Sequence, residues 1–211
     1  MRVVLASKSP ARLATLRAAG LDPEVQVSDV DEDALLRELN APRARSASDQ
    51  VLALAAAKAS AVAARLNDQS AIVIGCDSMF EMDGEVRGKP VDADDALRRL
   101  RAMSGRSGLL HTGHAVHRLD TGEVALEAAQ TTVHIGRLTD DEITGYVKTG
   151  EPLTVAGSFT IDGIGGWFVD GVDGDHTNVI GISLPLLRRM LSGLGIPILD
   201  LLTIHSAELT S

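Results

Sequence analysis

Apolar residues along the chain fall into short runs separated by polar clusters, a pattern typical of buried strands alternating with helices. The clearest run covers residues 71–74, between a polar stretch and Gly75. Four consecutive apolar residues predict a strand buried on both faces inside an α/β sheet. Asp77 follows the point where this strand is expected to end, and ligands of such sheets gather at the carboxyl ends of strands. Asp77 is therefore a candidate catalytic acid, although it could simply cap the next turn through its side chain.

The same patterns predict the other elements of the fold. A hairpin is expected around Asp83-Gly84, a strong turn signal. Turns are expected at residues 170–175, where Gly and Asp alternate. Further strands are predicted at residues 2–6, 24–27, 109–119 and 123–135, and helices at 11–19, 49–66 (capped by Ser48 or Asp49), 92–103, 139–148 and 183–192.

The first predicted strand leads into Ser7-Lys8-Ser9-Pro10. Ser9 is suited to the N-cap of the next helix, and Pro10 to its first turn. Two hydroxyls, Lys8 and Arg12 thus meet at a helix N-terminus, an arrangement that binds phosphate. The alternative is a capped helix with incidental cations.

The sequence leaves open the roles of two further charged groups. The acidic run at residues 28–33 could be a solvated helix cap, or Asp31 and Glu32 could hold a hard divalent cation. Lys58, within an Ala-rich helix, could extend to solvent or point into a cleft. His111, His114 and His117 do not predict a metal site, because side chains of a strand alternate between its faces.

Composition narrows the class of protein. The chain has 211 residues, 45% of them hydrophobic, which is enough for one substantial core or two joined lobes. A formal charge of −9 and 2% aromatic residues argue against binding nucleic acid or a membrane surface. The single cysteine, Cys76, excludes an internal disulfide framework. Without a signal peptide or a long apolar run, we expect a cytoplasmic protein.

The chain carries neither a dinucleotide fingerprint nor a P-loop motif. It contains a set of acidic and a set of basic side chains, but no candidate covalent nucleophile with a general base beside it. This combination suits metal-assisted attack of water on a phosphoanhydride. The acids are Asp31, Glu32 and Asp77, and the cations are Lys8, Arg12, Lys58 and Lys89.

An ordered series of motifs across residues 1–192 resembles the Maf family. The series comprises Leu5-Ala6-Ser7-Lys8-Ser9-Pro10-Ala11-Arg12, Asp31-Glu32, Lys58, Gly75-Cys76-Asp77-Ser78, Gly88-Lys89-Pro90, Ser104-Gly105, Gly150-Glu151-Pro152, Ala156-Gly157, Gly174-Asp175 and Asn178-Val179-Ile180-Gly181. The resemblance implies an α/β fold with a mixed central sheet flanked by helices and two lobes with a cleft. It also implies one Maf-like domain over residues 1–192, followed by a peripheral tail at 193–211.

The resemblance further implies a nucleoside triphosphate pyrophosphatase that releases a nucleoside monophosphate and pyrophosphate, using Mg²⁺ or Mn²⁺. Family members are often homodimers with a house-cleaning role, and the family has been linked to septum formation. The family's proton acceptor corresponds to Asp77, and a metal ligand to Glu32, alongside Asp77. The phosphate ligands correspond to Ser7, Ser9, Arg12, Lys58 and Lys89.

Several positions depart from the family pattern. Asp162 stands where a glutamine marks the thymidine and uridine triphosphate subgroup, and an acid cannot donate the amide hydrogen bonds. Asp162, with His111 and Trp167, is a candidate for the base pocket, and the preferred base stays open. The other departures are Ala11 for Arg, Cys76 and Ser78 for Ala and Thr, Gly108 for His and Val155 for Lys.

Two other functions remain in view. A non-catalytic nucleotide-binding regulator of septum formation would not need a positioned Asp77. Hydrolysis of another phosphoanhydride, such as a nucleotide sugar or a dinucleotide, would use the same groups on a different substrate.

Overall fold

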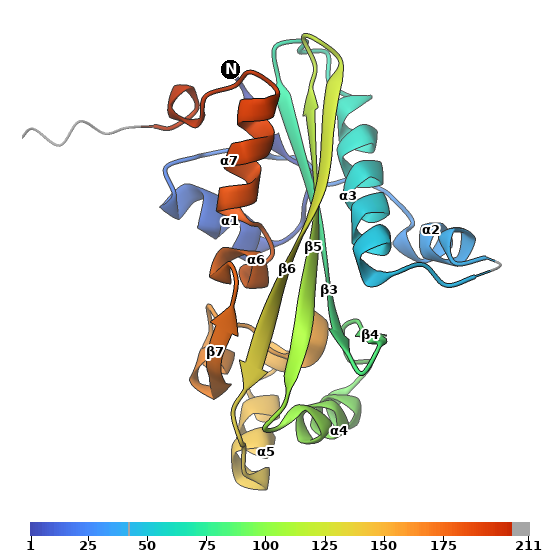
Figure 1. Ribbon diagram of the computed structural model, residues 1–211, viewed down its shortest axis with the longest axis vertical. Coiled ribbons are helices and arrows are strands. Elements are labelled where there is room, and N and C mark those ends of the chain that lie inside the picture. Colours follow the sequence, from blue (N-terminus) through green and yellow to red (C-terminus); the bar gives the residue numbers. More distant parts are fainter. Residues whose placement is uncertain (42, 204–211) are drawn as a thin grey trace, which may run out of the picture.

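A seven-stranded mixed sheet forms the centre of the computed structural model, which describes residues 1–41 and 43–203 (Figure 1). The strand order is β2-β1-β3-β5-β6-β7, with β4 beside β3. The β1 strand runs parallel to β2 and β3, and the other pairs are antiparallel. The strands are β1 (Val3–Leu5), β2 (Glu24–Val25), β3 (Ile72–Met82), β4 (Glu85–Arg87), β5 (Ser107–Arg118), β6 (Glu123–Ile135) and β7 (Val169–Asp173).

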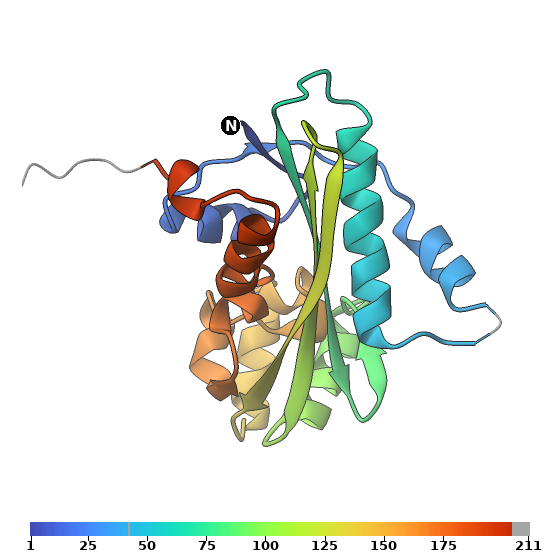
Figure 2. The ribbon, with the colours of Figure 1, turned by 45° about the horizontal axis from the view of Figure 1, so that its top comes forward.

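Helices cover both faces of this sheet, which confirms the expected α/β class. Near one end of the long strands, α3 lies on one face and α1 and α7 lie on the other, while α4 and α5 lie at the opposite end (Figures 1 and 2). The α-helices are α1 (Pro10–Ala18), α2 (Glu32–Leu39), α3 (Ala47–Ala63), α4 (Ala93–Met103), α5 (Asp140–Lys148), α6 (His176–Ile180) and α7 (Leu184–Gly193). Short 3-10 helices are η1 (Glu151–Leu153), η2 (Ala156–Ser158), η3 (Ile164–Phe168) and η4 (Ile198–Asp200).

Two apolar clusters mark the two ends of the sheet. One packs β1, β3 and β5 against α1 and α7, and the other packs the far ends of β3, β5 and β6 against α4 and α5. No helix among the described residues has the length and apolar character needed to cross a bilayer.

Local signals in the sequence act as predicted at several element ends. The Ser9 hydroxyl accepts a hydrogen bond from the backbone N–H of Arg12 at the start of α1. Thr139 and Glu142 form a capping box on α5. The prediction that Ser48 or Asp49 caps α3 is wrong, because α3 begins earlier and the Ser46 hydroxyl accepts from the backbone N–H of Asp49.

The β3 strand is longer than predicted and places Asp77 in its middle rather than after its end. Gly75 continues the strand, and its lack of a side chain lets α3 cross closely. A Cβ at this position would lie 2.9 Å from the backbone nitrogen of Ala59. Pairing with β5 then carries β3 without interruption from Ile72 to Glu81.

The other edge of β3 has a gap in its pairing. The β1 strand pairs with β3 only as far as Ile74, and β4 joins β3 only from Phe80 onward. Since β5 occupies the opposite edge throughout, residues 75–79 have no strand partner on this edge among the described residues. We call this stretch the β3 gap, and it leaves backbone groups next to Asp77 without a strand partner.

The prediction of turns at residues 170–175 is also wrong for its first part, since β7 pairs with β6. Beyond α7, Leu194 and Ile196 are buried in the cluster under α1 and α7, and the Thr203 N–H donates to the Gly20 carbonyl. The domain boundary after residue 192 stays a prediction, and residues 204–211 of the expected tail lie outside the described residues.

Replacing Gly113 with Ala should destabilise the fold, because a Cβ there would collide with the carbonyl of Val51 and lie 2.7 Å from the backbone nitrogen of Leu52. Helix α3 would have to move off the sheet. We expect the free energy of unfolding to fall by about 1–3 kcal/mol, measured by denaturant titration. Gly145→Ala in α5 is the control: beyond its chain neighbours and the backbone of its own helix, no atom lies within 4 Å of the Cβ that this variant adds, so a gain of about 0.5–1 kcal/mol is expected. Equal stability of Gly113→Ala and wild type would contradict this packing argument.

Candidate active site

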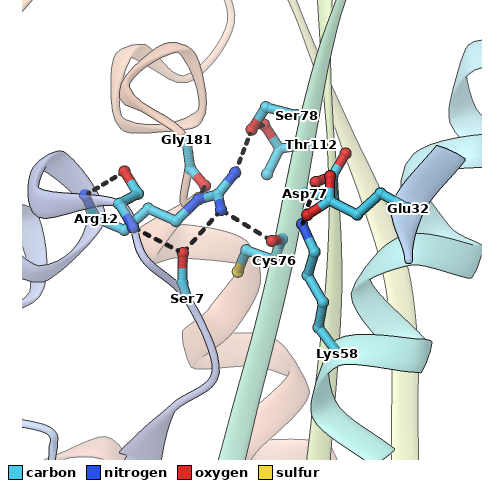
Figure 3. Close-up of polar contacts among 10 residues, drawn as sticks. Ser7, Arg12, Glu32, Lys58, Cys76, Asp77, Ser78, Thr112 and Gly181 are labelled. Carbon is cyan, nitrogen blue, oxygen red and sulfur yellow. Dashed lines mark hydrogen bonds and ion pairs between the residues drawn. The ribbon is translucent and has the colours of Figure 1, made fainter. Parts of the chain in front are cut away.

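Asp77, Lys58 and Glu32 form a linked group of charges on one side of β3 (Figure 3). The Lys58 ammonium lies 2.6 Å from Asp77 Oδ1 and 2.8 Å from Glu32 Oε1. The side chains of Asp77 and Lys58 are only 12% and 10% exposed, whereas that of Glu32 is 50% exposed. Two carboxylates thus share one ammonium, at the boundary between the core and solvent.

The structure decides between the alternatives left open for the acidic run and for Lys58. Asp31 caps α2, and its Oδ1 accepts a hydrogen bond from the backbone N–H of Ala34. Glu32, the next residue, is the acid that contacts Lys58. Lys58 projects from α3 onto Asp77 rather than to solvent. Of the two candidate acids, Glu32 therefore belongs to the group around Asp77.

The surroundings of Asp77 favour its protonated form more than water does. Burial raises its pKa, Lys58 and Arg12 lower it, and the net direction is upward. An upward shift brings a carboxyl closer to the range in which it exchanges protons at neutral pH. Burial also raises the pKa of the neighbouring Cys76 thiol to about 11, so this thiol stays protonated and is a poor nucleophile.

On the other side of β3, Arg12 fills the β3 gap (Figure 3). Its guanidinium donates to the backbone carbonyls of Cys76 at 2.8 Å and Gly181 at 2.7 Å. It also donates to the hydroxyls of Ser7 at 3.0 Å and Ser78 at 2.9 Å. Arg12 is 8% exposed. Its hydrogen bonds connect the turn after β1, the middle of β3 and the end of α6.

Sequence reasoning missed the polar chain behind Ser78. The Ser78 hydroxyl lies 2.9 Å from that of Thr112 on β5, and the Thr112 hydroxyl donates to the backbone carbonyl of Asn178. Thr112 is fully buried, and nothing in its local sequence marked it. The contacts of Asn178 and Gly181 lie within a motif that carried the family resemblance.

Two of the remaining candidate phosphate ligands, Ser7 and Ser9, contact Arg12 at this gap. Ser7 is buried and Ser9 half-buried, and the Ser7 hydroxyl accepts from the backbone N–H of Ser9. Lys89 is exposed and lies two residues past the end of β4, on the edge of β3 that contains the gap. The carbonyl of the preceding Gly88 accepts from Arg99 and from the backbone N–H of Gly157, which anchors the loop.

The candidates for a base pocket are separated by the fold. His111 is buried on β5, with its Nε2 3.0 Å from a carboxylate oxygen of Glu81. Asp162 and Trp167 are both exposed and lie in the glycine-rich segment before β7. The Asp162 carboxylate accepts from the hydroxyl of Thr160. Asp162 and Trp167 thus lie on the same exposed segment, whereas His111 is buried elsewhere, in the sheet. The binding of a nucleobase by these residues stays a prediction.

The donor set around Lys58 fits a hard divalent cation. Asp77 and Glu32 both direct carboxylate oxygens at one cation, the Lys58 ammonium. Magnesium commonly uses one or two carboxylates and completes its shell with water and substrate phosphates. Two acids are therefore a sufficient protein contribution, although no cluster of three potential ligands occurs among the described residues.

The fold is that of an α/β protein, and its candidate site combines two carboxylates, an ammonium and a guanidinium around the middle of β3. Comparisons with known proteins agree on the family. The family model described as "Maf-like protein" matches residues 2–194. The chain belongs to the Maf family.

Relatives with assigned names match over nearly the whole chain. A protein of Streptomyces avermitilis named nucleoside triphosphate pyrophosphatase is 54% identical over 202 residues, covering 96% of this chain and 95% of its own. A Salinispora tropica protein of the same name is 51% identical, covering 95% and 87%. A solved HAM1 protein of Coxiella burnetii aligns with a TM-score of 0.48 at 16% identity, covering 92% of this chain and 99% of its own.

Asp77→Asn should raise the free energy of unfolding at pH 7. The pKa of Asp77 is higher in the folded chain than the unfolded value of about 4. Ionised Asp77 therefore costs stability above its folded pKa, and this cost disappears as the pH falls through that pKa. The advantage of the variant should shrink accordingly as the pH is lowered toward about 4, measured by denaturant titration across pH.

Asp68→Asn is the matched control with the opposite sign. Hydrogen bonds from Ser70 lower the pKa of Asp68, so the ionised form stabilises the fold and its removal should cost stability at pH 7. A loss of stability in Asp77→Asn at pH 7 would contradict the assigned direction.

Proposed function

We propose that this protein hydrolyses nucleoside triphosphates to a nucleoside monophosphate and pyrophosphate. The observation that carries the proposal is the contact of buried Asp77 with buried Lys58 and half-exposed Glu32 at the β3 gap. The names of the relatives support the same reaction. A protein that only binds nucleotide has no need of a buried acid with a raised pKa, which lowers stability.

In the proposed reaction, water attacks the α-phosphorus and its proton passes to the Asp77 carboxylate. A new oxygen–phosphorus bond forms at the α-phosphate, the bond from the α-phosphorus to the bridging oxygen breaks, and pyrophosphate leaves. The raised pKa of Asp77 makes it a better proton acceptor than an ordinary carboxylate. Lys58 keeps the carboxylate oriented through its 2.6 Å contact.

The cations and hydroxyls around the gap have separate tasks in this proposal. Lys89, exposed after β4 on the same edge of β3, neutralises charge on the leaving pyrophosphate. Ser7 and Ser9 offer hydroxyls to phosphate oxygens. Arg12 already donates four hydrogen bonds to protein acceptors, so its main task is to hold Ser7 and Ser78 in place, and its contact with phosphate is secondary.

Glu32 and Asp77 are the residues that would hold Mg²⁺ or Mn²⁺. Such an ion would neutralise phosphate charge and help to orient the triphosphate. The Lys58 ammonium now lies between these carboxylates. Glu32, being half exposed, is the ligand that can turn toward the ion with the least cost in buried charge.

The wider setting of this activity is also part of the proposal. A charge of −9 is consistent with a cytoplasmic enzyme that acts on free nucleotides rather than on nucleic acid or membranes. A homodimer and a house-cleaning role, with a possible link to cell division, follow from membership of the family alone.

Asp77→Asn should reduce pyrophosphate release by about 100- to 10,000-fold, the usual contribution of a general base. The assay measures pyrophosphate from a panel of canonical and methylated nucleoside triphosphates with Mg²⁺ or Mn²⁺ present. The matched control is Asp141→Asn, which removes an exposed acid from the first turn of α5 and should leave the rate unchanged. If no triphosphate yields pyrophosphate, release of a sugar phosphate from a nucleotide sugar, or of mononucleotides from a dinucleotide, would assign a different phosphoanhydride substrate.

The pyrophosphate assay also distinguishes the proposed enzyme from a non-catalytic regulator. Saturable nucleotide binding without pyrophosphate release from wild type, under every metal condition, would favour the non-catalytic regulator of septum formation. Release from wild type that Asp77→Asn leaves unchanged would retain the enzyme and remove Asp77 from its mechanism.

Glu32→Gln should raise the metal concentration that gives half-maximal activity by about 10- to 100-fold, because it removes a charged ligand. The activity at saturating metal should recover in part, and chelator should abolish the activity of wild type. Asp33→Asn, at the next position of α2 and exposed, is the control and should keep the metal requirement of wild type. An unchanged metal requirement in Glu32→Gln would exclude Glu32 as a ligand.

A further inference from the structure

The Thr112 hydroxyl lies where two contacts that hold Arg12 meet (Figure 3). It donates a hydrogen bond to the backbone carbonyl of Asn178 at 3.1 Å, and it lies 2.9 Å from the Ser78 hydroxyl. Thr112 is the residue opposite Ser78 in the pairing of β5 with β3, and it is fully buried. The proposed mechanism assigns no task to this threonine.

The first contact is a chain of hydrogen bonds with a fixed direction. A backbone carbonyl only accepts, so the Thr112 proton is directed at Asn178. The Thr112 oxygen then accepts the proton of Ser78. The Ser78 oxygen in turn accepts from the Arg12 guanidinium at 2.9 Å, since a guanidinium only donates. The chain therefore runs one way, from the guanidinium through two hydroxyls to a carbonyl.

The second contact runs through the turn between α6 and α7. Thr112 holds the carbonyl of Asn178 in α6, and the buried His114 imidazole accepts from the backbone N–H of the N-cap residue of α7. Gly181 lies between these two fixed points, and its carbonyl accepts from Arg12 Nε at 2.7 Å. A Cβ on Gly181 would lie 3.1 Å from Arg12 Nε, so the turn follows the guanidinium closely. Strand β5 thus sets where this carbonyl lies.

The position of Arg12 determines how the Ser7 hydroxyl is presented. The Ser7 oxygen accepts hydrogen bonds from the guanidinium at 3.0 Å and from the backbone N–H of Ser9 at 3.2 Å. Because both lone pairs are used in this way, the hydroxyl can bind a further group only by donating its proton. Phosphate oxygens are acceptors, and a donor that is already held in place loses little entropy on binding them. A shift of the guanidinium would release this donor.

We propose, on the basis of the proposed function, that Thr112 is a positioning residue for the triphosphate. Its hydroxyl holds two of the acceptors that fix Arg12, those of Ser78 and Gly181, and Arg12 in turn orients Ser7. Thr112 itself does not contact the substrate. Since Ser7 binds phosphate in the ground state and in the transition state alike, Thr112 should affect KM more than kcat.

The test measures KM and kcat for pyrophosphate release in wild type, Thr112→Val and Thr112→Ser, with Mg²⁺ and the triphosphate that wild type prefers. Thr112→Val keeps the shape of the side chain but interrupts the chain of hydrogen bonds. KM should rise about tenfold, with kcat within about twofold of wild type. Thr112→Ser keeps the hydroxyl and should return KM to within about twofold of wild type.

The effects of Thr112 and Ser78 should not be independent. Ser78→Ala removes the next link of the same chain, so the double variant with Thr112→Val should raise KM no further than the larger of the two single variants. If the two single effects multiply in the double variant, the residues act separately and the proposal is overturned.

The matched control is Thr131→Val on β6. Thr131 is about as deeply buried as Thr112, but its hydrogen bonds among the described residues join it to the Asp175 carbonyl and the Asn178 amide rather than to Ser78. This variant should lose a similar amount of stability in a denaturant titration and keep the KM of wild type. An equal rise of KM in both valine variants would leave Thr112 a structural residue.

The affinity for inorganic triphosphate, measured by calorimetry with Mg²⁺, is a readout independent of turnover. The dissociation constant should rise about tenfold in Thr112→Val and keep its wild-type value in Thr112→Ser and Thr131→Val. Unchanged affinity in Thr112→Val would overturn the proposal. If Thr112→Val does not fold, Ser78→Ala opens the same chain and should raise the same constant.

The two proposals fail in different ways. If wild type binds inorganic triphosphate but releases no pyrophosphate from any nucleotide, the proposed function fails, and the dissociation constants of the variants decide the role of Thr112. If wild type does not bind inorganic triphosphate, the role of Thr112 in positioning it is overturned, whatever the rate of pyrophosphate release.

Discussion

The fold around the site depends on the Arg12 guanidinium in the β3 gap. Pairing on this edge of β3 stops at Ile74 and resumes at Phe80, which leaves strand carbonyls without a strand partner. A buried carbonyl without a hydrogen bond is costly, and Arg12 supplies one to Cys76 and another to Gly181. Arg12 thus takes the place of a strand partner at this edge, and it fixes three separate segments relative to one another.

A second constraint is the placement of charge at the limit of the core. Asp77 is nearly buried, and its partner Lys58 comes from α3, which crosses β3 closely because position 75 is glycine. Burial and the ammonium act on the pKa of Asp77 in opposite directions, and burial prevails. An acid that costs stability and contacts a lysine is expected where chemistry, rather than packing, determines the residue.

Much of the fold was predictable from local signals. Ser9 and Pro10 at the start of α1, Asp83-Gly84 at the hairpin and the capping box of Thr139 and Glu142 each act over a few residues, so their meaning does not depend on the rest of the chain. The family motifs, in order, identified the fold class and marked Asp77 and Lys58, which the structure brings within 2.6 Å. The role of these residues in catalysis stays a prediction.

The sequence by itself determined the starts of α1 and α5, the hairpin and the family, because each is encoded in neighbouring residues or in the order of motifs. Only the tertiary structure decided that β3 runs through Gly75 and that Glu32, rather than Asp31, joins the site. It also decided that residues 169–173 form a strand and that the Glu151 carboxylate accepts hydrogen bonds from the backbone N–H groups of Ile164 and Gly165. Each of these features depends on a contact with a residue distant in the sequence. Helix α3 packs against Gly75, and Lys58 forms an ion pair with Glu32. Strand β6 pairs with β7, and the Ile164 N–H donates to Glu151. Contacts of this kind leave no periodicity in the chain, so only the folded arrangement reveals them.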